Sequence, residues 1–365
     1  MTVFINGIGT HTPRGSILQS DAGKLAERYC CPTPEQSRLL PVLYRRTRVR
    51  RRHSVLLDGD FSWDNVPSLY HQSVDENDRG PTTQTRMAIY RDTAAILGAT
   101  ACVQAIEQSS FAADTITHLI TTSCTGFYAP GFDIELVAQL GLSPDVSRNH
   151  LGFMGCHAAM NAMRMAQGYV LADPSCRVLI CAVETCTLHH QYGWDPQSIV
   201  ANALFADGAA ALIVSAEPPT DPADGLHHVA SRSFIVPDTT DAMSWQIGDH
   251  GYRMTLESTV PETIRKQLGP WMSEFLDQHG LSQSDIGGWL VHPGGPRILD
   301  ATSEALGLPD DALAESMSVL ENYGNMSSPT VLFVLQQALK AKRPGPYVML
   351  GFGPGLTIEA ALLNQ

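Results

Sequence analysis

Long apolar runs and an excess of positive charge are both absent from this sequence. No stretch of about 18 consecutive apolar residues occurs, which excludes a membrane-spanning helix. The 24 Lys and Arg residues are outnumbered by 37 Asp and Glu residues, and the net charge of -13 argues against general nucleic-acid binding. Residues 1–7 lack the basic start and apolar segment of a signal peptide, so we expect them to enter the core as a strand.

Cysteine is too sparse for a disulfide scaffold. Eight cysteines are spread over 365 residues, and no pair shows the CxxC spacing of a zinc site. The cysteines and histidines between residues 181 and 190 also fit no common zinc pattern. We therefore expect neither a metal nor another resident cofactor, and we expect reduced thiols in the cytoplasm.

Alternating strand and helix patterns indicate an α/β fold. The nearly all-apolar run Arg177–Val183 is typical of a strand buried on both faces of a central sheet. The order of elements repeats loosely in the second part of the chain, which indicates internal duplication. The proline-rich stretch Pro218–Pro222 is the best boundary, and it divides the chain into halves at residues 1–220 and 221–365.

Hydrophobic periodicity, glycine and proline place the elements along the chain. Residues 21–47 look helical, but prolines interrupt them. We expect strands at 3–8, 118–124, 177–183, 209–215, 227–236 and 288–291, and two strands around a glycine-rich turn within 347–363. We expect further helices at 85–108, 133–140, 157–171, 198–205, 258–279, 296–306 and 328–340.

A glycine directly precedes a cysteine at Gly155-Cys156, and the Ala- and Met-rich run that follows predicts the helix over 157–171. Cys156 then lies on a strand-to-helix elbow, at the helix N-terminus. Unpaired backbone N–H groups and the helix dipole stabilise a thiolate there, so we expect a lowered thiol pKa and a nucleophile. A small core residue at a tight turn is the alternative.

Two further stretches place a polar side chain beside glycine at the end of an element. His292 begins the stretch His292–Pro296, and Asn325 lies within Tyr323–Ser328. Glycine and proline hold the backbone in special dihedral angles and leave room for a ligand. One such histidine or asparagine is usually structural, but three such stretches together indicate one reactive site. The glycine-rich residues 351–355 hold no catalytic group and are interpreted as a turn against the wall of that site.

Six arginines fall within Arg45–Arg52, a local reversal of charge in an acidic chain. One interpretation is a solvated face. The other is a clamp for a phosphorylated carrier such as coenzyme A, or for an acidic carrier protein. Cys124, at the polar end of a predicted strand, faces either a site or the core, and its pattern favours the core.

Five stretches together resemble the chalcone-synthase-like, type III class of polyketide synthases, which are thiolase-fold condensing enzymes. They are Gly155-Cys156, Ala203–Ala211, His292–Pro296, Gly324–Ser328 and Gly351–Thr357. The similarity runs from about residue 85 to the C-terminus, and the segment 126–130 resembles bacterial members more than plant members. The resemblance implies a thiolase-like αβαβα layered fold with two pseudo-duplicated halves.

The resemblance also implies roles for individual residues. The catalytic set falls on Cys156, His292 and Asn325. One of the family's two gatekeeper phenylalanines falls on Phe205, whereas Met254 stands at the position of the other. The candidate substrate-binding residues are Phe205 and Met254 at the neck of the pocket, Arg46 and Arg297 for coenzyme A, and Cys124.

The chemistry of these residue types fits a condensing enzyme. A thiolate at Cys156 accepts an acyl group from a carrier thioester, and loss of carbon dioxide from a malonyl thioester leaves an enolate. His292 and Asn325 can donate hydrogen bonds to its oxyanion, and a proton on His292 would help to keep Cys156 ionised. The predicted function is iterative decarboxylative Claisen condensation of malonyl-CoA onto an acyl-CoA starter, followed by cyclisation to a pyrone, resorcinol or related aromatic product.

Two alternatives to this function stay open. One is a single-round β-ketoacyl-ACP synthase III-like enzyme, against which the tail at 351–357 favours the polyketide class. The other is a non-catalytic partner subunit of the same fold, against which the intact set of Cys156, His292 and Asn325 argues. Delivery of acyl groups by an acyl carrier protein is a further possibility.

Two more expectations concern the starter and the assembly. The thioether of Met254 is flexible, which favours alkyl starters over rigid aromatic ones, unless a bulky group behind it closes the tunnel. Because thiolase-type folds pair by two-fold symmetry, the resemblance implies a homodimer. We expect its contact near Cys124 and residues 125–130.

Overall fold

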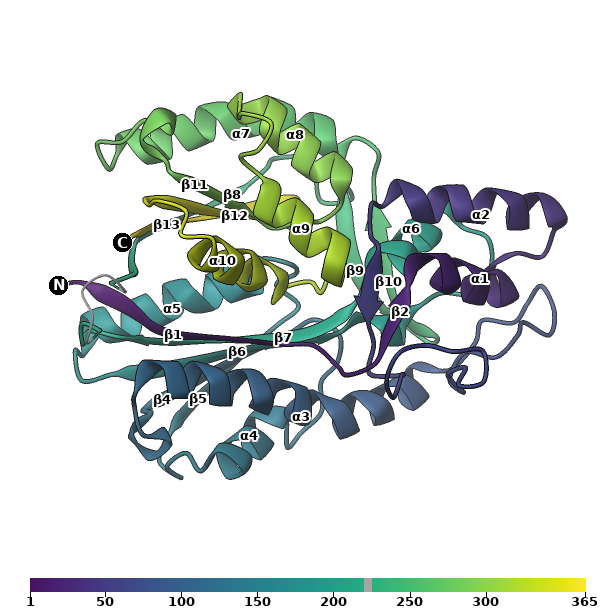
Figure 1. Ribbon diagram of the computed structural model, residues 1–365, viewed down its shortest axis with the longest axis horizontal. Coiled ribbons are helices and arrows are strands. Elements are labelled where there is room, and N and C mark those ends of the chain that lie inside the picture. Colours follow the sequence, from purple (N-terminus) through teal and green to yellow (C-terminus); the bar gives the residue numbers. More distant parts are fainter. Residues whose placement is uncertain (220–224) are drawn as a thin grey trace.

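The computed structural model describes residues 1–219 and 225–365 as alternating layers of helices and strands (Figure 1). Helices α7 and α8 cover one outer face, α3 and α4 cover the other, and α5 and α10 lie between the two sheet layers. The predicted αβαβα order is confirmed. The predicted boundary between residues 220 and 221 lies outside the described residues, so the division into halves there stays a prediction. The helices are α1 (Gln19–Cys30), α2 (Pro34–Arg46), α3 (Thr83–Ser109), α4 (Phe132–Leu140), α5 (Ala158–Ala172), α6 (Pro196–Leu204), α7 (Val260–Asp277), α8 (Pro296–Leu306), α9 (Ala314–Tyr323) and α10 (Thr330–Lys340).

The two sheet layers are joined edge to edge in the order β11-β12-β13-β8-β1-β7-β6-β4-β5. The short pairing of Val3 with His228 and of Phe4 with His227 connects them. The strands are β1 (Val3–His11), β4 (His118–Ser123), β5 (Ser147–Gly152), β6 (Arg177–Thr185), β7 (Asp207–Ser215), β8 (His227–Ile235), β11 (Gly288–Val291), β12 (Tyr347–Gly353) and β13 (Thr357–Asn364). Two hydrogen-bonded pairs stand apart from this sheet, β2 (Ser16–Leu18) with β3 (Arg51–His53) and β9 (Met243–Gly248) with β10 (Gly251–Leu256).

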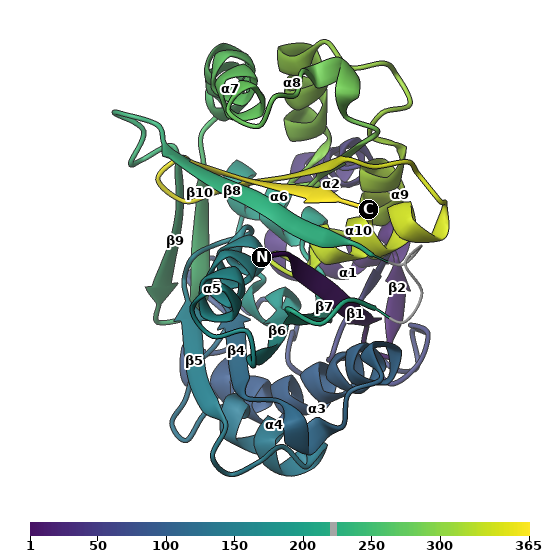
Figure 2. The same ribbon diagram turned by 90° about the vertical axis from the view of Figure 1, so that its left-hand side faces the viewer.

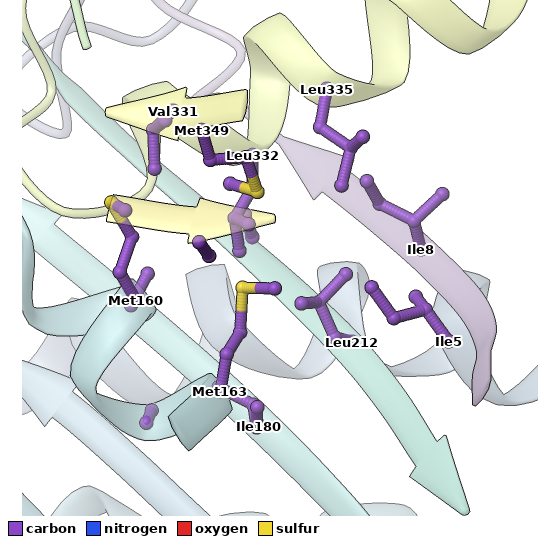
Figure 3. Packing of buried hydrophobic residues seen from close by; sticks show 14 of the residues in the cluster. Ile5, Ile8, Met160, Met163, Ile180, Leu212, Val331, Leu332, Leu335 and Met349 are labelled. Atoms are coloured by element: carbon purple, nitrogen blue, oxygen red, sulfur yellow. The ribbon is translucent and has the colours of Figure 1, made fainter. Parts of the chain in front are cut away.

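Three buried apolar clusters fill the spaces between the layers. The central cluster packs α5 and α10 against strands from both sheet layers and includes Met160, Met163, Ile180, Leu212 and Leu332 (Figure 3). The outer clusters pack α7 and α8 on one sheet layer, and α3 and α4 on the other. Each Å² of buried apolar surface contributes roughly 25 cal/mol to folding stability. Because α5 and α10 bury apolar side chains against both sheet layers, packing holds this middle layer from both sides. The packing of α5 therefore fixes the position of its N-terminal end.

The ends of α1, α2 and α6 gather with the β9–β10 hairpin at one end of the layers (Figures 1 and 2). A separate apolar cluster joins α1, α2 and α6 there. Helix α2 accommodates Pro41 in its interior, and Thr33 caps its start through a reciprocal hydrogen-bond pair with Gln36. The predicted interruption of residues 21–47 by prolines is confirmed before Pro34, where α2 begins, but not at Pro41, which lies inside α2.

Strand β5 and the β9–β10 hairpin were not predicted from the sequence, for different reasons. Strand β5 lies at the sheet edge with mostly exposed side chains, so it lacks apolar alternation. The β9–β10 hairpin is only partly buried, but apolar and polar residues alternate over 243–247 and glycines flank its turn at residues 248 and 251. Within the described ranges, no helix combines the length and the apolar character that crossing a bilayer demands.

Candidate active site

Cys156 lies in the short connection between β5 and α5, next to the first turn of that helix. Gly155 precedes it with a φ of +80°, a left-handed conformation that favours glycine. A Cβ on this residue would also lie 2.2 Å from Cδ of Pro354, in the turn between β12 and β13. The predicted strand-to-helix elbow is confirmed, and both the backbone conformation and the available space require glycine before the cysteine.

Asn325 and Ser327 approach the Cys156 sulfur from the connection between α9 and α10. Both side chains lie close enough to that sulfur to favour its ionised form. The Asn325 Oδ1 accepts a hydrogen bond from the Ser327 N–H at 2.8 Å, and its Nδ2 donates to the Gly294 carbonyl at 3.5 Å. The Gly294 N–H donates in turn to the His292 carbonyl at 2.9 Å. The three stretches singled out from the sequence therefore meet at one place.

The His292 side chain is buried, and both of its ring nitrogens lack a hydrogen-bond partner among the described residues. Unpaired buried polar atoms are rare in proteins, and each calls for an explanation such as a ligand that binds there. Burial, with a smaller contribution from nearby His157, lowers the pKa of His292 to about 3. The imidazole is therefore neutral at pH 7, with one nitrogen that can donate and one that can accept a proton.

Cys156 keeps some exposed surface, but the surrounding protein still dominates its ionisation. Burial raises the pKa of the Cys156 thiol to about 11, although the hydrogen bonds from Ser327 and Asn325 oppose this rise. The expectation of a lowered thiol pKa is therefore wrong, because desolvation outweighs the helix N-terminus. Of the two states left open for His292, burial favours the neutral one, so thiol and imidazole are both neutral at pH 7.

A buried carboxylate, Glu184 near the end of β6, lies close to Cys156 and Cys124. It accepts hydrogen bonds from the Cys124 N–H at 3.0 and 3.1 Å and from the hydroxyls of Thr125 at 2.7 Å and Ser328 at 3.2 Å. Burial raises the pKa of Glu184 to about 7, and these hydrogen bonds oppose the rise. A carboxyl group that titrates near neutral pH changes the charge beside the thiol over the physiological range.

Cys124 is buried and contacts the segment that carries Cys156. Its Sγ accepts a hydrogen bond from the Gly155 N–H at 3.1 Å, and its carbonyl accepts one from Nε1 of Trp245 at 2.7 Å. Burial raises the pKa of the Cys124 thiol well above its ordinary value. The preferred reading of Cys124 as a buried residue is confirmed, and its role in binding substrate stays a prediction.

Phe205 and Met254 lie together in a small apolar cluster with Cys186 and Ala201. Trp245 packs on this cluster from β9, where it pairs with Met254 across the hairpin. The ring centroids of Trp245 and Phe205 are 5.9 Å apart, and the cavity that these side chains line has a volume of about 10 Å³. Trp245 is therefore one of the side chains that close the space beside Met254.

The arginine run does not form one surface. Arg46 is exposed at the end of α2, whereas Arg52 is only 2% exposed. Arg48 and Arg50 form exposed ion pairs with acidic side chains. Arg297 is exposed in the first turn of α8 and donates to a backbone carbonyl at 3.4 Å. A clamp made by the whole run is therefore wrong, and the contacts of Arg46 and Arg297 with coenzyme A stay predictions.

Sequence reasoning missed Glu184, Ser327 and Trp245. A signal existed for Glu184, because a charged residue at the end of an all-apolar strand needs hydrogen-bond partners in the interior. Ser327 adopts a left-handed backbone with a φ of +55°, which no local residue pattern marks. Trp245 lies in the β9–β10 hairpin, and the alternation of apolar and polar residues over 243–247 was a signal that could have found it.

The chain matches two family models along almost its whole length. They describe the N-terminal and C-terminal domains of chalcone and stilbene synthases and match residues 2–218 and 227–365. Among curated proteins, the alpha-pyrone synthesis polyketide synthase-like Pks18 of Mycobacterium tuberculosis is 34% identical over 99% of this chain and 90% of its own length. The 1,3,6,8-tetrahydroxynaphthalene synthase of Streptomyces peucetius is 32% identical over 99% of this chain and 92% of its own length.

Solved structures share the thiolase-like layering. Polyketide synthase PKS-I from the brown alga Ectocarpus siliculosus has a TM-score of 0.89 at 29% identity, over 100% of this chain and 98% of its own. The C-terminal type III polyketide synthase domain of Steely1 from Dictyostelium has a TM-score of 0.90 at 26% identity, over 100% of this chain and 99% of its own.

Replacing His292 should slow the reaction of Cys156 with iodoacetamide. A thiol whose pKa is raised by burial reacts faster at pH 7 when a neighbouring group accepts its proton during the attack. We expect the neutral His292 ring to accept it in the transition state only, because a pKa of about 3 makes it a weak base at rest. We expect His292→Gln to lower the alkylation rate at pH 7 by about tenfold or more, with a smaller effect near pH 10. Mass spectrometry of the labelled protein measures these rates.

His228→Gln is the matched control, because His228 is also buried but lies on β8. It should leave the alkylation of Cys156 unchanged. Equal rates for His292→Gln and the unmodified chain across this pH range would contradict the role of the imidazole as a base.

Proposed function

Because this chain belongs to the chalcone and stilbene synthase family and is a type III polyketide synthase, we propose that Cys156 carries its growing acyl chain. The observation that supports this assignment is the meeting of Cys156, Asn325 and the unpaired imidazole of His292 in one buried site. Acyl-CoA and malonyl-CoA are then the substrates, and the chain uses no resident cofactor.

The first half-reaction loads the starter onto the enzyme. While the sulfur attacks the carbonyl carbon of the acyl-CoA, the neutral His292 ring accepts the proton of the Cys156 thiol in the transition state only, because its low pKa makes it a weak base. The bond between that carbon and the sulfur of coenzyme A breaks, and the proton passes from His292 to the departing thiolate. Since one thioester replaces another of similar energy, positioning of the two sulfurs is the main contribution of the protein.

The second half-reaction extends the chain. Malonyl-CoA loses carbon dioxide, and a ring N–H of His292 and the Nδ2 of Asn325 donate hydrogen bonds to the enolate oxygen that forms. The enolate carbon attacks the acyl-cysteine carbonyl and expels the Cys156 thiolate, so the chain, two carbons longer, is now attached to coenzyme A. Transfer back to Cys156 permits another round.

The relatives indicate the class of product. One is named for alpha-pyrone synthesis and the other for tetrahydroxynaphthalene, an aromatic compound. We infer that several extensions are followed by cyclisation to a pyrone, resorcinol or related aromatic product. Mass spectrometry of the products separates this from a single-round enzyme, which would release a chain extended once. Comparing the rates of product formation with starters carried by coenzyme A and by an acyl carrier protein shows which carrier delivers the starter.

Arg46 and Arg297 are proposed to contact coenzyme A. Both guanidinium groups are exposed, and α8, which carries Arg297, begins just after His292. Arginine binds phosphate through paired N–H donors, which suits the phosphates of this carrier.

The state of the cysteines supports a reducing compartment. All eight are free thiols, and disulfides are rare in the cytosol. We therefore propose a cytoplasmic location.

The pocket beside Phe205 favours short, flexible starters. Met254 can move aside, but Trp245 helps to fill the space beside it and is held by its hydrogen bond to the Cys124 carbonyl. A long or rigid starter would have to displace the indole and break that bond.

We further propose a homodimer that forms through residues 125–130 and β5. The side chains of Phe127 and Met154 are 54% and 39% exposed. They flank β5, which pairs with β4 and forms the edge of the sheet. Exposed apolar side chains beside an open sheet edge favour association with another chain.

Cys156→Ala should separate the two half-reactions. Without the thiol no acyl-enzyme forms, so we expect product formation to fall by about a thousandfold or more. Decarboxylation of malonyl-CoA, which requires His292 and Asn325, should persist. Chromatography of acetyl-CoA and mass spectrometry of the products measure the two activities, and Asn325→Ala, which should lose decarboxylation, is the comparison. Normal product formation by Cys156→Ala would overturn the mechanism.

Trp245→Ala should extend the range of starters. Each methylene group that enters the new space contributes about 0.8 kcal/mol, so two further methylenes correspond to more than about tenfold in specificity. We expect kcat/KM for decanoyl-CoA relative to hexanoyl-CoA to rise by about that factor. Trp63→Ala, at an exposed tryptophan, is the control. An unchanged ratio would show that Trp245 does not limit the pocket.

Phe127→Glu should dissociate the dimer. We expect the unmodified protein to sediment at twice its chain mass of 39.6 kDa at micromolar concentration, and the variant to sediment as a monomer because the charge enters the contact. Val74→Glu, at another exposed apolar side chain, should remain dimeric. A monomeric unmodified protein would contradict this proposal.

A further inference from the structure

Arg52 differs from the rest of the arginine run because its side chain is buried, with an exposed fraction of 2%. We propose that Arg52 is a positioning residue that holds Phe205 and, through the backbone, Asn325 in the geometry that condensation requires. This inference rests on the proposed function of Asn325 as a hydrogen-bond donor to the enolate.

The guanidinium group of Arg52 binds the end of α6. One of its nitrogens, Nη1, donates hydrogen bonds to the carbonyl oxygens of Asn202 and Phe205, the latter at 2.9 Å. Nε2 of Gln19 donates to the neighbouring Ala203 carbonyl at 2.7 Å. Carbonyls at a helix C-terminus have no partner within the helix, and a cation there also interacts favourably with the helix dipole. Arg52 therefore holds the last turn of α6 and the backbone of Phe205, the residue that follows this helix.

The segment around Phe205 is hydrogen-bonded directly to the segment that carries Asn325. The Asn325 N–H donates to the Leu204 carbonyl at 2.9 Å, and the Ala206 N–H donates to the Asn325 carbonyl at 2.9 Å. These two bonds flank Phe205 on both sides. A shift of the Phe205 carbonyl toward or away from Arg52 therefore moves the backbone of Asn325 as well, and with it the side chain that reaches Cys156.

A buried acid, Asp207, lies close enough to Arg52 to interact with its charge. Asp207 accepts hydrogen bonds from the N–H and hydroxyl of Thr187 at 2.7 and 2.6 Å and from the Val55 N–H at 2.8 Å. Burial raises the pKa of Asp207 to about 6, and Arg52 is among the groups that oppose this rise. The carboxylate is thus mostly ionised at pH 7, and its negative charge partly offsets that of the buried guanidinium group.

The burial of Arg52 also argues against a role for this residue in binding coenzyme A. A phosphate of coenzyme A cannot reach a side chain that is 2% exposed, and the guanidinium group already donates to two carbonyls. Arg52 instead connects β3 to the end of α6 through hydrogen bonds to backbone carbonyls.

The experiment compares Arg52→Gln and Arg52→Lys with Arg86→Gln. Arg86 is also buried and donates to carbonyls, those of Leu188 and His190, but these lie outside the Phe205–Asn325 pairing. All three variants lose buried hydrogen bonds, so each is expected to lower Tm. Two rates, divided by the fraction of folded protein, are then measured. Decarboxylation of malonyl-CoA depends directly on Asn325, whereas alkylation of Cys156 by iodoacetamide depends on it only through one of the two hydrogen-bonding side chains at the sulfur.

We expect Arg52→Gln to lower decarboxylation by about tenfold or more while changing alkylation by less than about threefold. Arg52→Lys keeps the charge but has no planar fork, so it should be intermediate. Arg86→Gln should leave the ratio of the two rates unchanged. Should Arg52→Gln fail to fold, Arg52→Lys supplies the same comparison.

A normal ratio of the two rates in Arg52→Gln or, if that variant does not fold, in Arg52→Lys would overturn the positioning role. An equal fall in both rates would overturn it too, since that is the effect of general loosening. Asn325→Ala, measured in parallel, separates this result from a failure of the proposed function. If Asn325→Ala decarboxylates normally, the function of Asn325 is wrong; if it does not, the ratio in the Arg52 variants decides the inference alone.

Discussion

Desolvation of the polar groups around Cys156 is the constraint on which the site depends. It keeps the thiol and the His292 imidazole neutral at pH 7, raising the pKa of one and lowering that of the other. Burying a neutral group costs less free energy than burying a charged one. The site can therefore exclude water with little loss of folding stability. The same low-dielectric environment strengthens hydrogen bonds to a charge that appears during a reaction. Burial thus opposes ionisation at rest and favours stabilisation of the enolate.

The layered fold provides that burial. The central apolar cluster clamps α5 and α10 between the two sheet layers (Figure 3), so the segments at their N-terminal ends, which carry Cys156 and Asn325, approach each other. His292 follows β11 and reaches the same place from the other sheet layer. Cys156 lies in the first half of the chain, and His292 and Asn325 lie in the second. The packing of the middle layer, more than contacts among these three side chains, therefore holds them together.

Around this centre, polar groups are fixed by backbone atoms. Glu184 binds the Cys124 N–H, and Arg52 binds the Phe205 carbonyl, so each buried charge is matched by main-chain partners. Such bonds are directional, and leaving either partner unpaired in the interior is costly. The walls of the site are consequently stiff, whereas Met254 and Trp245 at the pocket neck are held by packing and by one hydrogen bond. Variation in substrate is expected at the neck and not at the reactive centre.

The sequence by itself determined the α/β class, most helices and buried strands, and the three stretches around Cys156, His292 and Asn325, because local glycine and apolar patterns mark them. It could not determine the ionisation of Cys156, since the helix N-terminus is a local effect and burial is a tertiary one. The roles of Trp245 and Arg52 were also decided only by the tertiary structure. Alternation of apolar and polar residues marks the strand that carries Trp245 but does not show that its indole packs on Phe205. Arg52 lies in a run of arginines that looks uniform along the chain. Which side chain of such a run turns inward depends on carbonyl groups that are distant in sequence and arrive only when the chain folds.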